Sequence, residues 1–318
     1  MFLDWLLLIV GMALLIKGAD FFVDGASGIA KKFGIPSLII GLTLVSLGTS
    51  APEISISINA VLSGSSDMSV GNVIGSNICN IFLILGISAI FTPLIISKEI
   101  KRYDIPIMLG MFIILVLFSF VITPNAINWY EGLILLLIFI GYTIFLIFRA
   151  KNNPEENLDE EETKFNMIKC IIFVVIGLAA IIFGGDFVVE HARNIALDLG
   201  MSETLVSLTI VAVGTSLPEL VTSVVAAFKK EGDIAVGNVI GSCIFNIILI
   251  LGLASIVAPI GGVVLSVQSA IIFDLIVMIV GGVAMFTVSL FSKKISRWQG
   301  ILFLACYIAY IVYIIIRN

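Results

Sequence analysis

Charged side chains are scarce in this sequence, and their scarcity argues against a soluble protein. Only 12% of the 318 residues are Asp, Glu, Lys or Arg, whereas 60% are hydrophobic, and the mean hydropathy is +1.20. Soluble domains have about 25% charged and about 45–50% apolar residues. The composition therefore indicates a protein that crosses a membrane several times.

Other absences narrow the function. The one histidine, His191, has no counterpart in the repeat described below, which argues against a hydrolase built on Ser50 or Ser216. The four cysteines lie in apolar segments without metal-ligand spacing, and we interpret them as small core residues. No glycine-rich phosphate-binding loop is present, which excludes an ATP-driven pump within this chain. We therefore expect neither an enzyme nor a bound cofactor, and no nucleic-acid or obligate protein partner is evident.

The apolar segments predict an all-α polytopic membrane protein. A bilayer core takes about 20 apolar residues per helix, and the sequence divides into about ten such segments. We place them near 2–30, 36–60, 70–93, 104–123, 129–149, 167–197, 203–227, 234–258, 267–290 and 298–316. The acidic stretch 151–165 separates a first five-helix unit, 1–150, from a second, 166–318. It lacks the pattern of a Ca²⁺-binding loop, so we expect a solvated linker.

One motif occurs twice. It runs from Thr43 to Gly86 and again from Thr209 to Gly252, and the offset between the copies is constant, with no residue gained or lost. Each copy holds one carboxylate, Glu53 or Glu219, directly after a proline that follows a Gly-Thr-Ser run. An odd number of helices per copy would place the second copy upside down in the membrane, as in the inverted repeats of many transporters.

The two glutamates are the strongest candidates for a functional site. A charged side chain at the middle of a bilayer costs about 2.5–3.5 kcal/mol or more and by default marks an ion or substrate path. Pro52 and Pro218 have no backbone N–H, so each breaks the helix beside its glutamate and leaves carbonyl groups that need another partner. Such carbonyls and carboxylates, with nearby hydroxyls, form the all-oxygen set that hard cations such as Ca²⁺ select. The hydroxyls belong to Thr49, Ser50, Thr215 and Ser216.

The later part of each copy carries a polar stripe. Asn72, Ser76 and Asn80 are spaced four apart, and so are Asn238, Ser242 and Asn246, so that each trio lies on one face of a helix. A G-x-x-x-G spacing within each stripe allows helix backbones to approach closely. We expect the stripes to lie near the glutamates. The sequence leaves open whether Asn72 and Asn238 bind ions or only form hydrogen bonds between helices.

These motifs resemble the repeats of the calcium/cation antiporter superfamily, and most closely its prokaryotic Na⁺/Ca²⁺ exchanger branch. The resemblance rests on GTSAPE at 48–53 with GNVIGSNICN at 71–80, and on GTSLPE at 214–219 with GNVIGSCIFN at 237–246. It implies the Na⁺/Ca²⁺ exchanger fold, with two inverted five-helix repeats, and secondary antiport of Ca²⁺ against Na⁺ at a shared midplane site by alternating access. It also implies that the helices near 2–30 and 167–197 slide across the rest.

One Ca²⁺ or two Na⁺ would cancel the charges of Glu53 and Glu219, so competition for one site is enough for exchange. In the resembling family, neighbouring Na⁺ sites use the residues that match Ser50, Ser76, Asn80, Ser216, Ser242 and Asn246, with backbone carbonyls near Ser46 and Ala212. The transported ions implied by the resemblance are therefore Ca²⁺ and Na⁺.

Na⁺ is the predicted coupling ion. The family's H⁺/Ca²⁺ exchangers have a glutamate where this chain has Gly75 and Gly241. Protons could still couple by titrating Glu53 or Glu219, so Ca²⁺/H⁺ antiport is the alternative, and a cation channel is a third candidate. K⁺-dependent members have an acid in place of Asn246, which argues against K⁺ co-transport here.

Basic residues predict the orientation in the cell membrane. Most of the 17 Lys and Arg residues lie in the loops, or at the helix ends, that follow the odd-numbered helices. By the positive-inside rule these loops, including the acidic linker, are cytoplasmic and both termini are extracellular.

Overall fold

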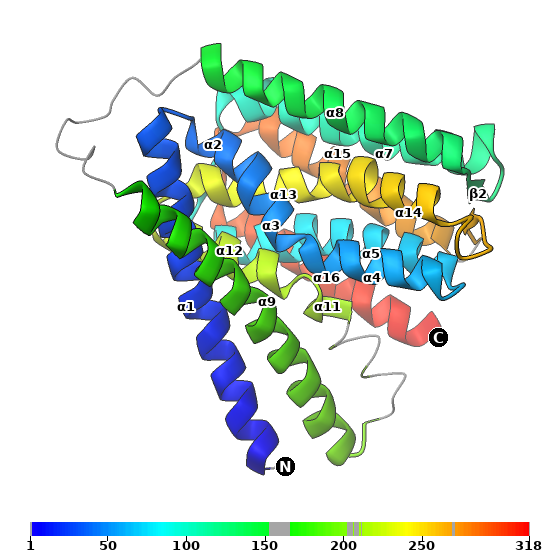
Figure 1. Cartoon of the computed structure of the whole chain (residues 1–318), viewed down its shortest axis with the longest axis horizontal. Coiled ribbons are helices and arrows are strands. Elements are labelled where there is room, and N and C mark those ends of the chain that lie inside the picture. The colour runs from blue at the N-terminus through cyan, green and yellow to red at the C-terminus, as the bar shows by residue number, and fades with distance from the viewer. Residues whose placement is uncertain are drawn as a thin grey trace.

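The computed structural model describes residues 2–152, 166–201, 206, 210, 212–268 and 271–317. Long helices dominate it, and most of them run roughly parallel or antiparallel to one another (Figure 1). Eight helices of the described residues are long and apolar enough to cross a membrane, and a further apolar helix pair, Ser37–Thr49 and Ala51–Leu62, is bent by 45°. The prediction of an all-helical membrane protein is therefore confirmed.

The first half of the chain contains the following elements: α1 (Phe2–Phe33), α2 (Ser37–Ile40), η1 (Gly41–Val45), α3 (Ser46–Thr49), α4 (Ala51–Leu62), α5 (Ser66–Ile78), η2 (Cys79–Ile84), α6 (Leu85–Phe91), β1 (Leu94–Ile95), η3 (Ile100–Asp104), α7 (Ile105–Leu117), η4 (Phe118–Ile122), β2 (Ala126–Ile127) and α8 (Trp129–Asn152). The η elements are π-helical turns within longer helices, and they leave the predicted spans continuous.

The second half contains α9 (Met167–Asp198), α11 (Ala212–Gly214), α12 (Leu217–Phe228), α13 (Gly232–Phe245), η7 (Asn246–Leu251), α14 (Gly252–Val257), β3 (Leu265–Ser266), α15 (Ile272–Phe291), β4 (Lys294–Ile295) and α16 (Arg297–Arg317). The segment predicted at 203–227 lies partly outside the described residues, and its described part is mainly α11 and α12. The linker 151–165 lies outside them from residue 153 on.

Two spans form the centre of the bundle. In the span Ser66–Phe91 and in the span Gly232–Val257, 83% of the most apolar 18-residue stretch is buried inside the protein. In the other six candidate spans the buried share of that stretch is 17–39%. These two spans carry the Asn and Ser stripes. Because they are surrounded by protein instead of lipid, their polar side chains can find partners, and any irregular backbone is kept away from hydrocarbon.

The two halves of the chain interlock at the periphery. Strand β1 pairs antiparallel with β4, and β2 pairs with β3, so each two-residue ribbon joins the first half to the second. Helix α8 packs on α14, where a Cβ at Gly132 would lie only 2.8 Å from the carbonyl oxygen of Gly252. Helix α16 packs on α6 in the same manner, with Gly300 against Gly86. Glycine is required at these contacts because the backbones touch.

Helices α1 and α9 form a separate pair that runs obliquely to the other long helices (Figure 1). Their backbones approach closely along the shared face: a Cβ at Gly18 would lie 2.9 Å from the Gly177 oxygen, and a Cβ at Gly177 would lie 2.6 Å from the Phe22 nitrogen. At the N-terminal end of α1, Asp4 lies 3.2 Å from Nδ1 of His191 on α9. The pair is therefore held together along its length as one unit.

Candidate cation site

Each glutamate lies at the start of a half-helix. Helix α3 ends at Thr49 and α4 begins at Ala51, while residues 215–216 form a turn before α12, which begins at Leu217. A proline is tolerated in the first turn of each half-helix, because the N–H group that it lacks would have no acceptor within the helix at that position. Glu53 and Glu219 occupy the same first turns, where the positive end of the helix dipole favours a carboxylate. The predicted helix break at each proline is confirmed.

Both carboxylates are buried without a cationic partner. Glu53 and Glu219 are each 1% exposed, and among the described residues no Lys, Arg or His side chain pairs with either. One oxygen of each, Oε2, has no hydrogen-bond partner in this part of the chain. An uncompensated buried charge is strongly unfavourable, so these carboxylates need either a bound cation or a proton.

Hydrogen bonds between the halves bring the two motif copies together. The Ser50 hydroxyl donates to Oε1 of Glu219 at 2.9 Å and lies 3.2 Å from the Ser242 hydroxyl. The Thr49 hydroxyl oxygen lies 3.1 Å from Oδ1 of Asn238. Residues predicted from two stretches far apart in the sequence therefore share one site.

Further buried oxygens belong to the predicted set. Asn80, Asn246 and Ser216 are each 1% exposed, and their Oδ1, Oδ1 and Oγ atoms have no hydrogen-bond partner among the described residues. Asn80 lies in η2, and Asn246 begins η7, so both occur where the helix widens to a π-turn. Such turns are frequent at functional sites. Ser76 and Ser242 are also buried.

Asn72 and Asn238 are engaged in hydrogen bonds between helices. Nδ2 of Asn72 donates to Oγ of Ser57 at 3.0 Å, and Nδ2 of Asn238 donates to Oγ of Ser223 at 2.9 Å. Each Nδ2 also lies 3.4 Å from the backbone oxygen of its glutamate, Glu53 or Glu219. These two asparagines thus hold each half-helix against the central span that follows it.

The remaining predicted residues lie around the helix breaks. The Ser46 hydroxyl donates to the Leu42 oxygen at 2.9 Å, and the Ser46 carbonyl accepts from the Ser50 N–H at 3.0 Å. Ala212 begins α11, and its side chain is not among those described. Thr215 lies in the turn before α12 and lines the cleft described next.

A cleft of about 700 Å³ lies between α9 and the two helix breaks. Its wall on α9 carries Asp186, Glu190 and Arg193, and its opposite wall includes Thr215 and both prolines of the motif. The acidic residues thus line the same cleft as the helix breaks.

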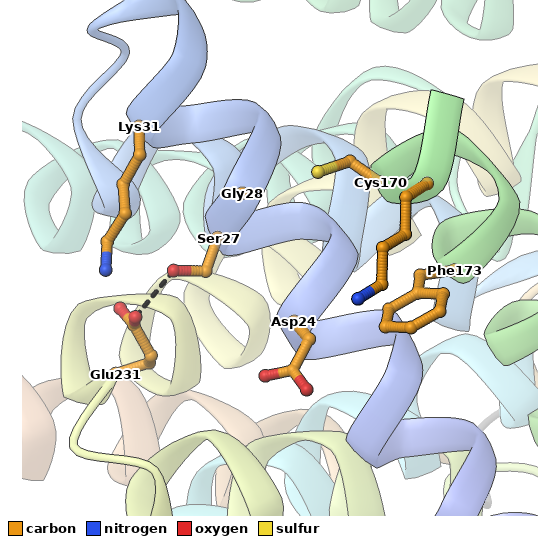
Figure 2. A pocket seen from close by; sticks show the side chains of 8 residues that line it. Asp24, Ser27, Gly28, Lys31, Cys170, Phe173 and Glu231 are labelled. Carbon is orange, nitrogen blue, oxygen red and sulfur yellow. Dashed lines mark hydrogen bonds between the residues drawn. The ribbon is translucent and has the colours of Figure 1, made fainter. Parts of the chain in front are cut away.

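The other end of α1 is fixed to the ends of α12 and α13. Nζ of Lys229 lies 2.7 Å from Asp20 Oδ1 and 2.6 Å from Asp24 Oδ1. Burial alone would lower the pKa of Lys229, but the hydrogen bonds and charges of these two carboxylates outweigh it, so the pKa is raised. Ser27 donates to Oε1 of Glu231 at 2.6 Å beside a separate cavity of about 330 Å³ (Figure 2). None of the predicted ion-site residues lines that cavity.

Sequence reasoning missed Asn77. This residue is fully buried next to Ser76, and its Oδ1 accepts a hydrogen bond from Nδ2 of Asn246 at 2.9 Å. The available signal was the difference between the copies, because the counterpart of Asn77 in the second copy is Cys243. The interpretation of the cysteines holds for three of them, but it is wrong for Cys306, which lies exposed on the outer side of α16.

The chemistry available here is that of a cation site with few charges. No group of three or more His, Cys, Asp or Glu side chains comes together in the parts of the chain that the structure describes. Two carboxylates therefore have to be complemented by neutral hydroxyl, amide and carbonyl oxygens. That donor set fits hard cations such as Na⁺ and Ca²⁺, and it does not fit transition metals that prefer His or Cys.

A family model described as "Sodium/calcium exchanger protein" matches residues 3–148 and again residues 169–316. The chain belongs to the sodium/calcium exchanger family. Among exchanger relatives, the sodium/calcium exchanger MaX1 of Methanosarcina acetivorans is 35% identical over 348 residues, with 97% of each chain covered. The inner membrane protein YrbG of Escherichia coli is 37% identical over 268 residues, with 81% of each covered. A solved structure of the sodium-calcium exchanger NCX_Mj has a TM-score of 0.82 and 35% identity, and the match covers 98% of each chain.

Proposed function

We propose that this protein is a secondary antiporter that exchanges Ca²⁺ for Na⁺ at the site formed by Glu53 and Glu219. One observation carries the proposal: two carboxylates without a cationic partner are buried together at paired helix breaks, each with an oxygen that lacks a hydrogen-bond donor. A divalent ion or two monovalent ions would neutralise them. Membership of the exchanger family, and the fact that MaX1 and NCX_Mj are sodium/calcium exchangers, support the choice of ions.

The ligands follow from the same geometry. Ca²⁺ binds between Glu53 and Glu219, with hydroxyls of Thr49 and Thr215 nearby. Na⁺ uses the carboxylates together with neutral oxygens, and the buried, unpartnered oxygens of Ser216, Asn80 and Asn246 support this assignment. Ser50, Ser76 and Ser242, with carbonyl groups near Ser46 and Ala212, complete the proposed set.

Alternating access follows from competition for a shared site. The empty site holds two uncompensated buried charges, so it is unfavourable, while either Ca²⁺ or Na⁺ satisfies it. A conformational change without an ion is therefore disfavoured, and the flux of one ion depends on the other. The oblique pair α1 and α9 is the proposed moving element: α9 lines the cleft, and α1 is tied to the ends of α12 and α13.

Reconstituted liposomes test the coupling ion. Vesicles loaded with Na⁺ are diluted into Na⁺-free buffer with Ca²⁺, at constant pH and K⁺ and with the membrane potential clamped. We expect Ca²⁺ uptake that saturates and requires internal Na⁺. Uptake that ignores Na⁺ but follows an imposed pH difference would establish Ca²⁺/H⁺ antiport instead. Non-saturating flux without any counter-ion would identify a channel.

We further propose that the fold consists of about ten membrane spans in two inverted five-helix repeats, 1–150 and 166–318, joined by the linker. The separate matches of one family model to each half support the repeat. The matching contacts of Asn72 with Ser57 and of Asn238 with Ser223 support equivalent packing. With the linker cytoplasmic and both termini extracellular, the cleft beside Asp186 and Glu190 opens outward.

Labelling from either side of the membrane tests this topology. Single cysteines at Asn157 and Asn318, in a background with the native cysteines replaced, are expected to react with an impermeant thiol reagent from opposite sides. Reaction of both from one side would contradict the odd number of spans per repeat.

A further inference from the structure

The amide of Asn77 is fixed at both ends. Its Oδ1 accepts from Nδ2 of Asn246 at 2.9 Å, and its Nδ2 lies 3.6 Å from the sulfur of Met278 on α15. The residue is completely buried in α5. Because an amide that donates on one side presents its acceptor to the other, Asn77 offers only its oxygen to Asn246.

This contact decides how Asn246 is turned. When Nδ2 of Asn246 donates to Asn77, the other end of the same amide, Oδ1, points elsewhere, and that oxygen is buried without a hydrogen-bond partner among the described residues. An unpartnered amide oxygen in a buried site attracts a cation, whereas an NH₂ group in its place would repel one. The orientation of one amide thus determines whether residue 246 can serve as an ion ligand.

The equivalent pair, Cys243 of the second copy beside Asn80 of the first, contains a thiol in place of the amide. The counterpart of Asn77 is Cys243, whose thiol is a weak acceptor and lies 4.0 Å from the Asn77 backbone oxygen. Asn80 therefore has no amide partner corresponding to the one that orients Asn246. The two neutral amide ligands of the proposed site are held by different means.

We infer that Asn77 is a positioning residue, which keeps the amide oxygen of Asn246 directed into the site and thereby sets the affinity for Na⁺. The inference rests on the proposed antiport. Ca²⁺ is held mainly by the two carboxylates, so its binding depends less on one neutral oxygen. Loss of Asn77 thus affects Na⁺ more than Ca²⁺.

The test compares Asn77→Leu and Asn77→Ala with the wild type in the same liposome assay. Leu has the same branched shape as Asn but is larger and has no acceptor, and Ala removes the acceptor without adding volume. We expect the half-saturating Na⁺ concentration to rise about tenfold, because that is the effect of losing one hydrogen bond to an ion ligand. KM for Ca²⁺ should change less than about threefold. Met278→Leu removes only the weak sulfur contact of Asn77 and keeps its stronger contact with Asn246, so it is the matched control and should shift the half-saturating Na⁺ concentration less than about threefold.

A second background separates positioning from general stability. Asp in place of Asn246 presents an oxygen whichever way it turns, so in Asn246→Asp protein the additional Asn77→Leu change should have little effect on Na⁺ dependence. Stabilisation by added Na⁺ in thermal unfolding gives a readout that does not depend on transport.

Equal effects of Asn77→Leu in both backgrounds, an unchanged Na⁺ dependence, or failure of both Asn77 variants to fold would each overturn the inference, because Asn77 would then be structural or irrelevant. The transport assay on the wild-type protein distinguishes failure of this inference from failure of the proposed function. If wild-type uptake does not require Na⁺, the antiport itself is wrong.

Discussion

The two copies of the motif are nearly identical in sequence, but they are not identical in their hydrogen bonds. Ser50 of the first copy donates to Glu219, whereas the hydroxyl of its counterpart Ser216 has no partner among the described residues. Thr49 contacts Asn238, but no hydrogen bond joins their counterparts Thr215 and Asn72 in the described structure. The repeat therefore provides the same chemical groups twice, but the groups form different hydrogen bonds because their surroundings differ.

The comparison separates charge from hydrogen bonding. The two glutamates are equivalent in charge, in burial and in their position in a half-helix. The neutral groups around them are not equivalent. We therefore expect symmetric effects from changes of charge and asymmetric effects from changes of neutral groups.

The largest effect is expected for Glu53→Gln and Glu219→Gln. Each change keeps the shape and removes one of the two charges that compensate a divalent ion. Breaking a buried ion pair costs about 3–5 kcal/mol, so Ca²⁺ transport should fall more than about 100-fold in both variants. Uptake of radioactive Ca²⁺ measures this, with circular dichroism to check the fold. Exchange at the wild-type rate in either variant would contradict a shared site.

A smaller and asymmetric effect is expected for Ser50→Ala and Ser216→Ala. Ser50→Ala removes a donor to a carboxylate, worth about 1.5–3 kcal/mol, and should lower the unfolding temperature in ion-free detergent by roughly 3–6 °C. Ser216→Ala breaks no hydrogen bond of the described structure and should leave that temperature within about 1 °C, while it raises half-saturating Na⁺ about threefold to tenfold. Equal shifts of the unfolding temperature in Ser50→Ala and Ser216→Ala would contradict the proposed difference between the two copies of the motif.

The smallest difference is expected between Asn238→Ala and Asn72→Ala. Asn238 is fully buried and contacts Thr49 in addition to Ser223, whereas its counterpart is only partly buried and contacts Ser57. The additional lost contact corresponds to about 1 kcal/mol, or roughly 2–4 °C in unfolding temperature. Differential scanning fluorimetry of the two purified variants measures it. An unfolding temperature that is lower for Asn72→Ala than for Asn238→Ala would contradict this prediction.

Much of the fold and of the site could be predicted before any coordinates. The lengths of the apolar segments predicted where the spans lie, because the thickness of a bilayer determines how long a membrane-crossing helix must be. Proline beside a glutamate gave the broken helices, because a missing N–H acts locally. What could not be predicted depends on neighbours distant in the sequence: the strand pairs that join the halves, the contact of Ser50 with Glu219, and the cleft beside Asp186 and Glu190.

The sequence by itself determined which groups are present: two glutamates, their neighbouring hydroxyls and two stripes of asparagine and serine, written twice in the same order. Only the tertiary structure decided which of these groups remain free to bind an ion. Asn238 and Asn246 look alike as members of one stripe, but both ends of the Asn238 amide are engaged, because its Oδ1 accepts from Thr49 and its Nδ2 donates to Ser223, while Oδ1 of Asn246 has no partner among the described residues. The reason is physical: a buried polar atom is available to a ligand only where packing brings no other partner to it, and packing is set by the whole fold.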